Sequence, residues 1–306
     1  MKYRNNNMLL RIAQADAYAI AIEYVSRTNF SSLYEKMMMF DSYHQHPTYD
    51  KLVPGMYTDD TQQSCAIANT LIRCGLNAKQ KDFRDDFFYT FKDDPRDGYS
   101  RGFQSILERS ETPEHMSSLL EPYSTSNGAM MRSVPLGVLS NPYDVIQMAI
   151  TQASVTHLSS GGIHSSISVA LMSHFALHID ADFSKMHEWC CQWNKAHEYF
   201  REPWNGPVGT KTNNRQDLGI GMCTAWAVQT LLCEENSLMN IMKRIIAWGG
   251  DTDSVAAVAW GIASARYQNE ILPNFFERDL EKNSRPNRVL YLKDKSSKLM
   301  QIESEK

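Results

Sequence analysis

The chain has 306 residues, of which 42% are hydrophobic and 22% are charged, and its formal net charge is -4. These values suit a soluble globular protein with one large core. They exclude the overall basic character expected of proteins that bind nucleic acid or an anionic membrane surface. The longest apolar runs fall well short of the ~20 residues that span a bilayer, so we expect no membrane partner.

The first helix is predicted over residues 7–25, where apolar residues lie all round the helix, as in a core helix. Further helices are predicted over residues 61–75, 83–93, 102–110, 142–157, 162–179, 183–200, 220–235 and 237–250. No sustained period-two alternation bounded by turn residues is present. The sequence therefore predicts an all-α fold.

No proline- or serine-rich linker divides the chain, so we predict one domain over residues 1–290, followed by a charged, solvated C-terminal tail over residues 291–306. Two long polar stretches, residues 26–56 and 201–219, are predicted as loops, and loops of this length are usually functional or disordered. The first lies between Glu23 and an acidic cluster, a suitable place for a lid. The six cysteines form no CxxC pair, and acids interrupt the apolar N-terminal segment, so we expect a cytoplasmic protein with free thiols and no signal peptide.

Two predicted helices begin with more oxygen-bearing side chains than a cap requires. "TDDT" starts one at residues 58–61, and "GGDTDS" starts another at residues 249–254, ahead of the apolar run "VAAVAWGIASA". Asp, Ser and Thr are the usual N-cap residues, so capping alone is one interpretation. However, a cap needs a single such side chain, and surplus carboxylates repel one another unless a cation is present.

The alternative interpretation is a metal site. Together the two helix starts would supply four carboxylates and two hydroxyls, from Thr58, Asp59, Asp60, Asp251, Asp253 and Ser254. Hard oxygen ligands select magnesium, manganese or calcium over zinc or copper. Four carboxylates are many for one ion, so we predict two metal ions held close together.

Asp16 and Glu23 are a third acidic element. They are seven residues apart in the first predicted helix, so they are expected on one face of it. Because uncompensated buried carboxylates are costly, we expect these acids to take part in the site.

Five blocks of the sequence now resemble motifs of the ADP-ribosylglycohydrolase family, in that family's order. They are "AQADAYAIAIEY", "YTDDTQQS", "SNGAMMRSVPLG", "VTHLSS" and "WGGDTDSVAAVAWGIASARY", which lie in this order between residues 9 and 267. The best-known member of the family removes ADP-ribose from an arginine of dinitrogenase reductase. The resemblance implies a single-domain orthogonal helical bundle with two Mg²⁺ ions, or Mn²⁺, at its centre.

The resemblance also implies roles for individual residues. The six oxygen donors named above match the family's metal ligands, with Ser254 where many members have threonine. Glu23, Asp60 and Asp253 are the expected catalytic residues, with Asp60 and Asp253 nearest the reacting ribose. The segments "DGYSRGF", "SNGAMMR" and "TH" match substrate-binding segments and give these expected contacts: Asp97, Gly98, Gly102, Ser126, Asn127, Gly128, Met130 and His157.

The function that these matches imply is metal-dependent hydrolysis of the glycosidic bond between ADP-ribose and its acceptor, with protein arginine as the preferred acceptor. Two alternatives stay open. The acceptor could be serine or the acetyl group of O-acetyl-ADP-ribose, or the chain could bind ADP-ribose or neutralise a toxin without catalysis. The expected partners are an ADP-ribosylated protein or a small ADP-ribosyl compound, and an ADP-ribosyltransferase or its target.

Overall fold

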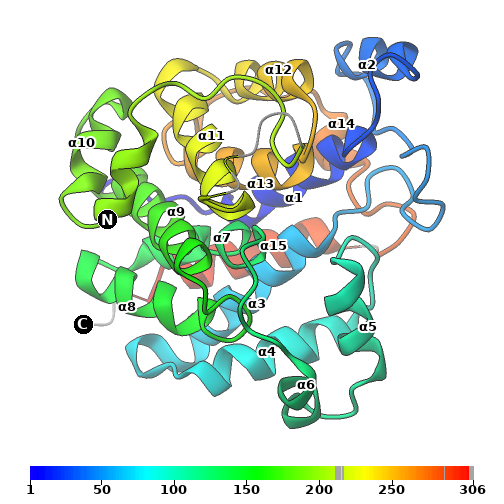
Figure 1. Ribbon diagram of the computed structural model, residues 1–306. Coiled ribbons are helices and arrows are strands. Elements are labelled where there is room, and N and C mark those ends of the chain that lie inside the picture. The colour runs from blue at the N-terminus through cyan, green and yellow to red at the C-terminus, as the bar shows by residue number, and fades with distance from the viewer. Residues whose placement is uncertain (211–214, 216, 286, 303–306) are drawn as a thin grey trace.

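The computed structural model describes residues 1–210, 215, 217–285 and 287–302, and these residues form a bundle of helices (Figure 1). In those ranges there is no β-strand, and only two isolated bridges occur, Tyr123 with His157 and Val208 with Gly250. The predicted all-α fold is confirmed. Among the described residues, no helix is both long and apolar enough to cross a membrane.

The helices follow one another along the whole chain. The α-helices are α1 (Met8–Ala19), α2 (Ser31–Met37), α3 (Asp59–Cys74), α4 (Gln80–Asp93), α5 (Arg101–Arg109), α6 (Pro113–Leu119), α7 (Gly128–Met131), α8 (Pro142–Ala153), α9 (Ser160–His178), α10 (Met186–Cys191), α11 (Ile220–Glu234), α12 (Leu238–Trp248), α13 (Thr252–Ala263), α14 (Phe275–Arg278) and α15 (Arg288–Leu299). The 3₁₀ helices are η1 (Ile20–Ile22), η2 (Gly75–Asn77), η3 (Val134–Val138), η4 (Phe183–Lys185) and η5 (Lys195–Phe200).

The centre of the bundle is the pair α1 and α13, which lie against each other (Figure 1). Every residue of α13 is buried, and its small side chains allow close packing. A Cβ on Gly261 would lie 2.7 Å from Cγ1 of Ile12, so only glycine fits this contact. At the other end of α13, the hydroxyl of Thr252 donates to the carbonyl oxygen of Ala19 at 2.8 Å. The acidic start of α13 is therefore fixed beside the end of α1, deep inside the molecule.

The first predicted helix is shorter than expected. α1 ends at Ala19 and η1 follows, and Glu23 then takes up an extended conformation with φ -57° and ψ 120°. Tyr24 has a positive φ of 50°, and its N–H donates to the carbonyl oxygen of Gly250 at 2.8 Å. The prediction that Asp16 and Glu23 share one helix face is thus wrong, because this contact pulls the chain out of the helix before Glu23.

Two further predicted segments differ from the structure. Residues 183–200 were expected as one helix, but η4, α10 and η5 are separate pieces. The side chain of Asn194 caps the start of η5 by accepting from the N–H of Ala196, and its amide donates to the carbonyl oxygen of His164. The predicted loop over residues 26–56 contains α2, a short helix at the edge of the molecule (Figure 1).

Most of the predicted tail packs on the bundle; its last residues, 303–306, lie outside the described part. Residues 291–299 belong to α15, which packs against α1 and α3. Leu292 and Leu299 are fully buried, and the hydroxyl of Ser296 accepts the N–H of Leu9 at 3.0 Å. The sequence was predicted as a tail because many of its residues are charged; in the structure these residues occupy the outer face of the helix. All six cysteines are free thiols, as expected.

Candidate active site

The two acidic helix starts meet in the middle of the bundle. The hydroxyl of Ser254 donates to Oδ2 of Asp60 at 3.3 Å, although these residues are 194 positions apart. Asp59 and Asp60 form the first turn of α3, while Asp251 precedes α13 and Asp253 lies in its first turn. All four carboxylates are buried. The juxtaposition on which the predicted metal site depends is therefore present.

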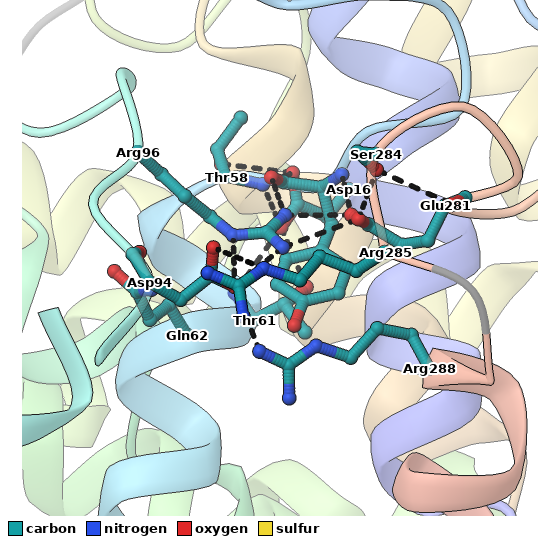
Figure 2. A network of polar contacts seen from close by, with 11 residues as sticks. Asp16, Thr58, Thr61, Gln62, Asp94, Arg96, Glu281, Ser284, Arg285 and Arg288 are labelled. Atoms are coloured by element: carbon teal, nitrogen blue, oxygen red, sulfur yellow. Dashed lines mark hydrogen bonds and ion pairs between the residues drawn. The ribbon is translucent and has the colours of Figure 1, made fainter.

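Asp16 organises the start of α3 from behind. Its carboxylate accepts hydrogen bonds from the N–H and the hydroxyl of Thr58, the latter at 2.8 Å, and from the N–H and the hydroxyl of Thr61, the latter at 2.6 Å (Figure 2). Because the Thr58 hydroxyl donates its hydrogen bond to Asp16, the lone pairs of the hydroxyl oxygen stay available to a cation. Asp16 thus acts as a positioning residue for the acids that follow Thr58.

Burial and mutual repulsion raise the pKa values of the carboxyl groups in this cluster. Glu23, Asp251 and Asp253 each offer an oxygen, and these oxygens all lie within 4.8 Å of one another. Burial, with the nearby charge of Asp251, raises the pKa of Glu23 to about 8. Burial also raises the pKa of Asp251 to about 6, and burial and neighbouring acids raise the pKa of Asp60 and of Asp253 well above the usual range. Ionising all of them requires a compensating positive charge.

Two carboxylate oxygens in this cluster have no hydrogen-bond donor. Oδ1 of Asp60 and Oδ1 of Asp253 are both buried and unpaired. Buried polar atoms in folded proteins nearly always have a partner. A cation bound in this cluster would supply that partner and would also reduce the repulsion among the acids. The donor set, carboxylates with two hydroxyls, fits Mg²⁺ or Mn²⁺.

The predicted lid loop contacts both the backbone carbonyl and the side chain of Glu23. Nε2 of His46 lies 2.9 Å from the carbonyl oxygen of Glu23, and Nδ1 of the same ring accepts the N–H of Thr48, so Nε2 carries the proton and donates. The His46 ring stacks on Tyr49 with centroids 4.0 Å apart. The phenol of Tyr49 interacts with the carboxyl group of Glu23, which limits the rise in the pKa of Glu23. This loop therefore fixes the position of the predicted catalytic acid.

The "SNGAM" turn contacts the acid cluster directly. The amide of Asn127 donates to Oδ2 of Asp251 at 2.6 Å and to the hydroxyl of Ser254 at 3.0 Å. Asn127, predicted as a substrate contact, therefore also orients two of the predicted metal ligands. Next to it, the hydroxyl of Ser126 lies 2.8 Å from Nε2 of His157.

His157, which follows α8, is a neutral, buried group that contacts this turn. Burial and the charge of Arg132 lower the pKa of His157 to about 3, so the ring is uncharged at physiological pH. A Cβ on Gly128 would come within 2.8 Å of its Cε1 atom, so glycine is required for the close approach. The arrangement suits His157 for hydrogen bonding and shape, and not for proton transfer near neutral pH.

A cavity of about 590 Å³ lies over the acid cluster, within the size range of ligand sites in proteins. Of the predicted residues, its lining includes Glu23, Asp59, Asp60, Gly98, Ser126, Asn127, Gly128, His157, Asp251, Asp253 and Ser254. Gly98, with φ +121°, lies so close to α3 that a Cβ would be 2.9 Å from Oδ1 of Asp59.

Four predicted residues lie outside that lining. Thr58 and Met130 are fully buried, and Oδ1 of Asp97 accepts from the amide of Gln104 at 3.0 Å. Gly102 lies on α5. Within the predicted loop 201–219, residues 211–214 and 216 lie outside the described part, and its other residues do not line the cavity. The substrate contacts assigned to Asp97, Gly102 and Met130 therefore have no geometric support here.

Comparison with known proteins identifies the chain. The family model described as ADP-ribosylglycohydrolase matches residues 5–301. The chain belongs to this family. It is 26% identical over 280 residues to ADP-ribosylhydrolase ARH3 from Bos taurus, covering 74% of each chain. It is 23% identical over 282 residues to ADP-ribosyl-[dinitrogen reductase] glycohydrolase from Rhodospirillum rubrum, covering 87% of this chain and 86% of the relative.

A solved structure of an ADP-ribosylglycohydrolase-related protein complex has the same fold. It superposes with a TM-score of 0.73 over 98% of each chain, at 21% sequence identity. The predicted resemblance is thus confirmed, and with it the prediction of a hydrolase of the ADP-ribosylglycohydrolase family.

Several residues of this ADP-ribosylglycohydrolase site were not predicted. Tyr49, Tyr99 and Arg132 line the cavity, and one wall of it is apolar, with Phe103, Ile106, Leu119 and Leu120. Arg132 belongs to the "SNGAMMR" block, so its presence there was a usable signal. Tyr49 gave none, because a tyrosine in a long polar loop has no fixed partner in sequence.

Arg132 is buried with neutral partners. It donates to Gln63, Gln152 and Thr156, and its guanidinium lies 4.0 Å from the centre of the Phe87 ring. Burial lowers the pKa of Arg132 to about 9. Its positive charge lowers the pKa of Asp59, so it partly offsets the charge of that acid.

Proposed function

We propose that this family member is a metal-dependent hydrolase that removes ADP-ribose from arginine side chains of a protein. The observation that carries the proposal is the pair of unpaired buried oxygens, Oδ1 of Asp60 and Oδ1 of Asp253, at the point where two acidic helix starts meet. Such an arrangement is unfavourable without a cation and favourable with one.

The proposed ligands are the six oxygen donors that the sequence predicts: Thr58, Asp59, Asp60, Asp251, Asp253 and Ser254. Together they suit two Mg²⁺ ions, or Mn²⁺. When bound, divalent cations in such a site hold ribose hydroxyls and lower the pKa of a water molecule. Asp16 and Asn127 would keep the ligands in place, since both donate to or accept from them.

The protein's own groups supply the remaining requirements. Glu23, with its raised pKa and its link to Tyr49, is suited to transfer a proton to the leaving group or from the attacking water. Asp60 and Asp253 lie at the floor of the cavity, where positive charge develops on the anomeric carbon during cleavage. The apolar wall at Phe103 and Leu120 limits the access of water to the bound substrate.

The preference for arginine follows from charge. A guanidinium acceptor is cationic, and Glu23, which lines the cavity and is not one of the proposed metal ligands, is the acid left to attract it. The name of the Rhodospirillum rubrum relative, which acts on a protein substrate, supports a protein-linked acceptor. A serine or O-acetyl linkage would lack this attraction.

The test is release of ADP-ribose from substrates linked through arginine, serine and O-acetyl groups, with Mg²⁺ or Mn²⁺ and with EDTA. We expect release from the arginine-linked protein, dependent on the cation, and its loss in Asp60→Ala and Asp253→Ala. Faster release from the serine-linked or O-acetyl substrate would contradict the proposed arginine acceptor and identify that substrate's linkage as the preferred one. Full activity in EDTA or in either variant would contradict the mechanism, and binding of ADP-ribose without release would favour a binding protein.

A further inference from the structure

The residue just before the first acidic motif is held by two buried charges. The N–H of Tyr57 donates to Oε1 of Glu281 at 3.0 Å, and its carbonyl oxygen accepts from Nη1 of Arg96 at 2.9 Å. The guanidinium of Arg96 also lies 3.9 Å from the centre of the Tyr57 ring. Both backbone groups of this one residue thus depend on a pair of charged side chains from distant parts of the chain.

Arg96 and Glu281 form an ion pair that is closed to solvent. Their side chains are each 0% exposed, and Nη1 of Arg96 lies 2.6 Å from Oε1 of Glu281. Asp94 also accepts from Arg96, at 2.6 Å, and from Arg288, at 2.7 Å (Figure 2). Figure 2 shows this network beside the Asp16–Thr58 contacts, so buried charged groups bind both Tyr57 and Thr58 at the start of α3.

The turn that contains Glu281 has a strained backbone conformation. Glu281 has a positive φ of 58°, which is unfavourable for a residue with a Cβ, and its N–H donates to the carbonyl oxygen of Gly55 at 2.9 Å. Gly55 has φ +88°, and a Cβ there would lie 2.5 Å from the carbonyl oxygen of Asp279. The turn and residues 55–57 are therefore in direct backbone contact.

A buried ion pair is not by itself a device for stability. Desolvation of the two charges offsets most of their attraction, so well-packed apolar residues often stabilise a fold as well or better. What an apolar pair cannot do is bind an N–H and a carbonyl oxygen of the same residue. The ion pair binds the backbone of Tyr57, one position before Thr58, so its role is to orient the residues that follow.

We propose that Arg96 and Glu281 are positioning residues for the cation site, and that they fix Tyr57 so that Thr58, Asp59 and Asp60 keep the geometry a divalent cation requires. The inference rests on the proposed function. Asp16 holds Thr58 and Thr61 from one side of the segment, and the ion pair holds Tyr57 from the other. Loss of outer partners of this kind typically weakens metal affinity by ~10–100-fold.

The experiment measures binding of Mn²⁺ alone by titration, below the unfolding temperature, for the wild type and three variants. Glu281→Gln keeps the shape of the side chain and removes its charge. Arg96→Met combined with Glu281→Leu removes both charges at similar volume. The control, Glu235→Gln, disrupts a half-buried ion pair with Arg244 on α12, away from the site.

We expect Mn²⁺ to bind Glu281→Gln and the double variant ~10–100-fold more weakly than the wild type, and the control to bind it unchanged. The double variant should regain thermal stability relative to Glu281→Gln without regaining affinity. In Glu281→Gln, saturating Mn²⁺ should restore kcat, which a purely structural defect would not allow.

Wild-type affinity in either site variant would overturn the inference while leaving the proposed function intact. So would failure of both to fold beside a folded control, because the pair would then serve the fold and not the site. A wild type that does not bind Mn²⁺ would contradict the proposed function itself, and the inference with it.

Discussion

Asp253→Asn should make the metal-free protein more stable. The substitution keeps the size of the side chain and its capacity to hydrogen-bond, but it removes one of three acids whose oxygens lie within 4.8 Å of one another. Two full charges at that distance repel by ~3 kcal/mol at an effective dielectric constant of about 20. Since protonation relieves part of this repulsion, we expect a gain of ~2 kcal/mol at pH 8, or ~4 °C in Tm for a chain of this size.

The gain should depend on pH. Burial and neighbouring acids raise the pKa of Glu23 to about 8 and that of Asp253 well above its usual range in the folded protein. Acids with raised pKa values favour the folded state below their unfolded-state pKa, near pH 4, and this contribution is lost as pH rises through the folded-state values. At pH 5 the cluster is largely protonated, so the variant and the wild type should then differ little in stability.

Calorimetry in EDTA and in Mn²⁺, at pH 5 and pH 8, measures both effects. Mn²⁺ should stabilise the wild type at pH 8 and have little effect on Asp253→Asn. Asp182→Asn is a matched control, because Asp182 caps η4 by accepting the N–H of Ser184 at 2.9 Å, which lowers the pKa of this acid. It should gain no stability and respond to Mn²⁺ as the wild type does. If Asp253→Asn in EDTA at pH 8 is less stable than the wild type, Asp253 is a capping residue and the electrostatic reasoning fails.

Three further substitutions test the supports of the site. Asp16→Asn should lower the free energy of unfolding by ~2–3 kcal/mol in chemical denaturation and weaken Mn²⁺ binding. Unchanged Mn²⁺ binding would show that Asp16 does not position the proposed ligands. Tyr49→Phe removes the phenol hydroxyl that lowers the pKa of Glu23, so kcat should fall ~10-fold or more at an unchanged Mn²⁺ affinity, and an unaltered kcat would show that Tyr49 has no part in the mechanism. Gly128→Ala places a Cβ 2.8 Å from Cε1 of His157, so KM should rise in steady-state assays, whereas a wild-type KM would show that the turn can adjust.

The helices that the sequence predicted well are those with local start and stop signals. α3 ends at Cys74 and is capped by Gly75, which has a positive φ of 53°. α8 begins with Pro142 after the cap residue Asn141, whose side chain accepts the N–H of Tyr143. Such signals act within a few residues, so they can be identified without knowledge of the fold. The acids at the starts of α3 and α13 were identifiable for the same reason.

The features that the sequence did not reveal depend on distant contacts. The break before Glu23 exists because Tyr24 binds the carbonyl oxygen of Gly250, which no local pattern indicates. Tyr49 reaches the site only because its loop folds back onto Glu23. The last helix did carry a signal, since Leu292 and Leu299 are seven residues apart and face the core. The density of charge around them led to the prediction of a tail.

The long sequence separations within the site have a kinetic consequence. Asp60 and Ser254 are 194 residues apart, and Asn127 and Asp251 are 124 apart, so their contacts close very long loops. We expect such contacts to form late in folding, after the helices and their local packing. A cation that binds them stabilises interactions absent from the transition state, so it should slow unfolding and leave the folding rate almost unchanged. Supply of the ion would then set how long each molecule survives in the cell, as well as whether it is active.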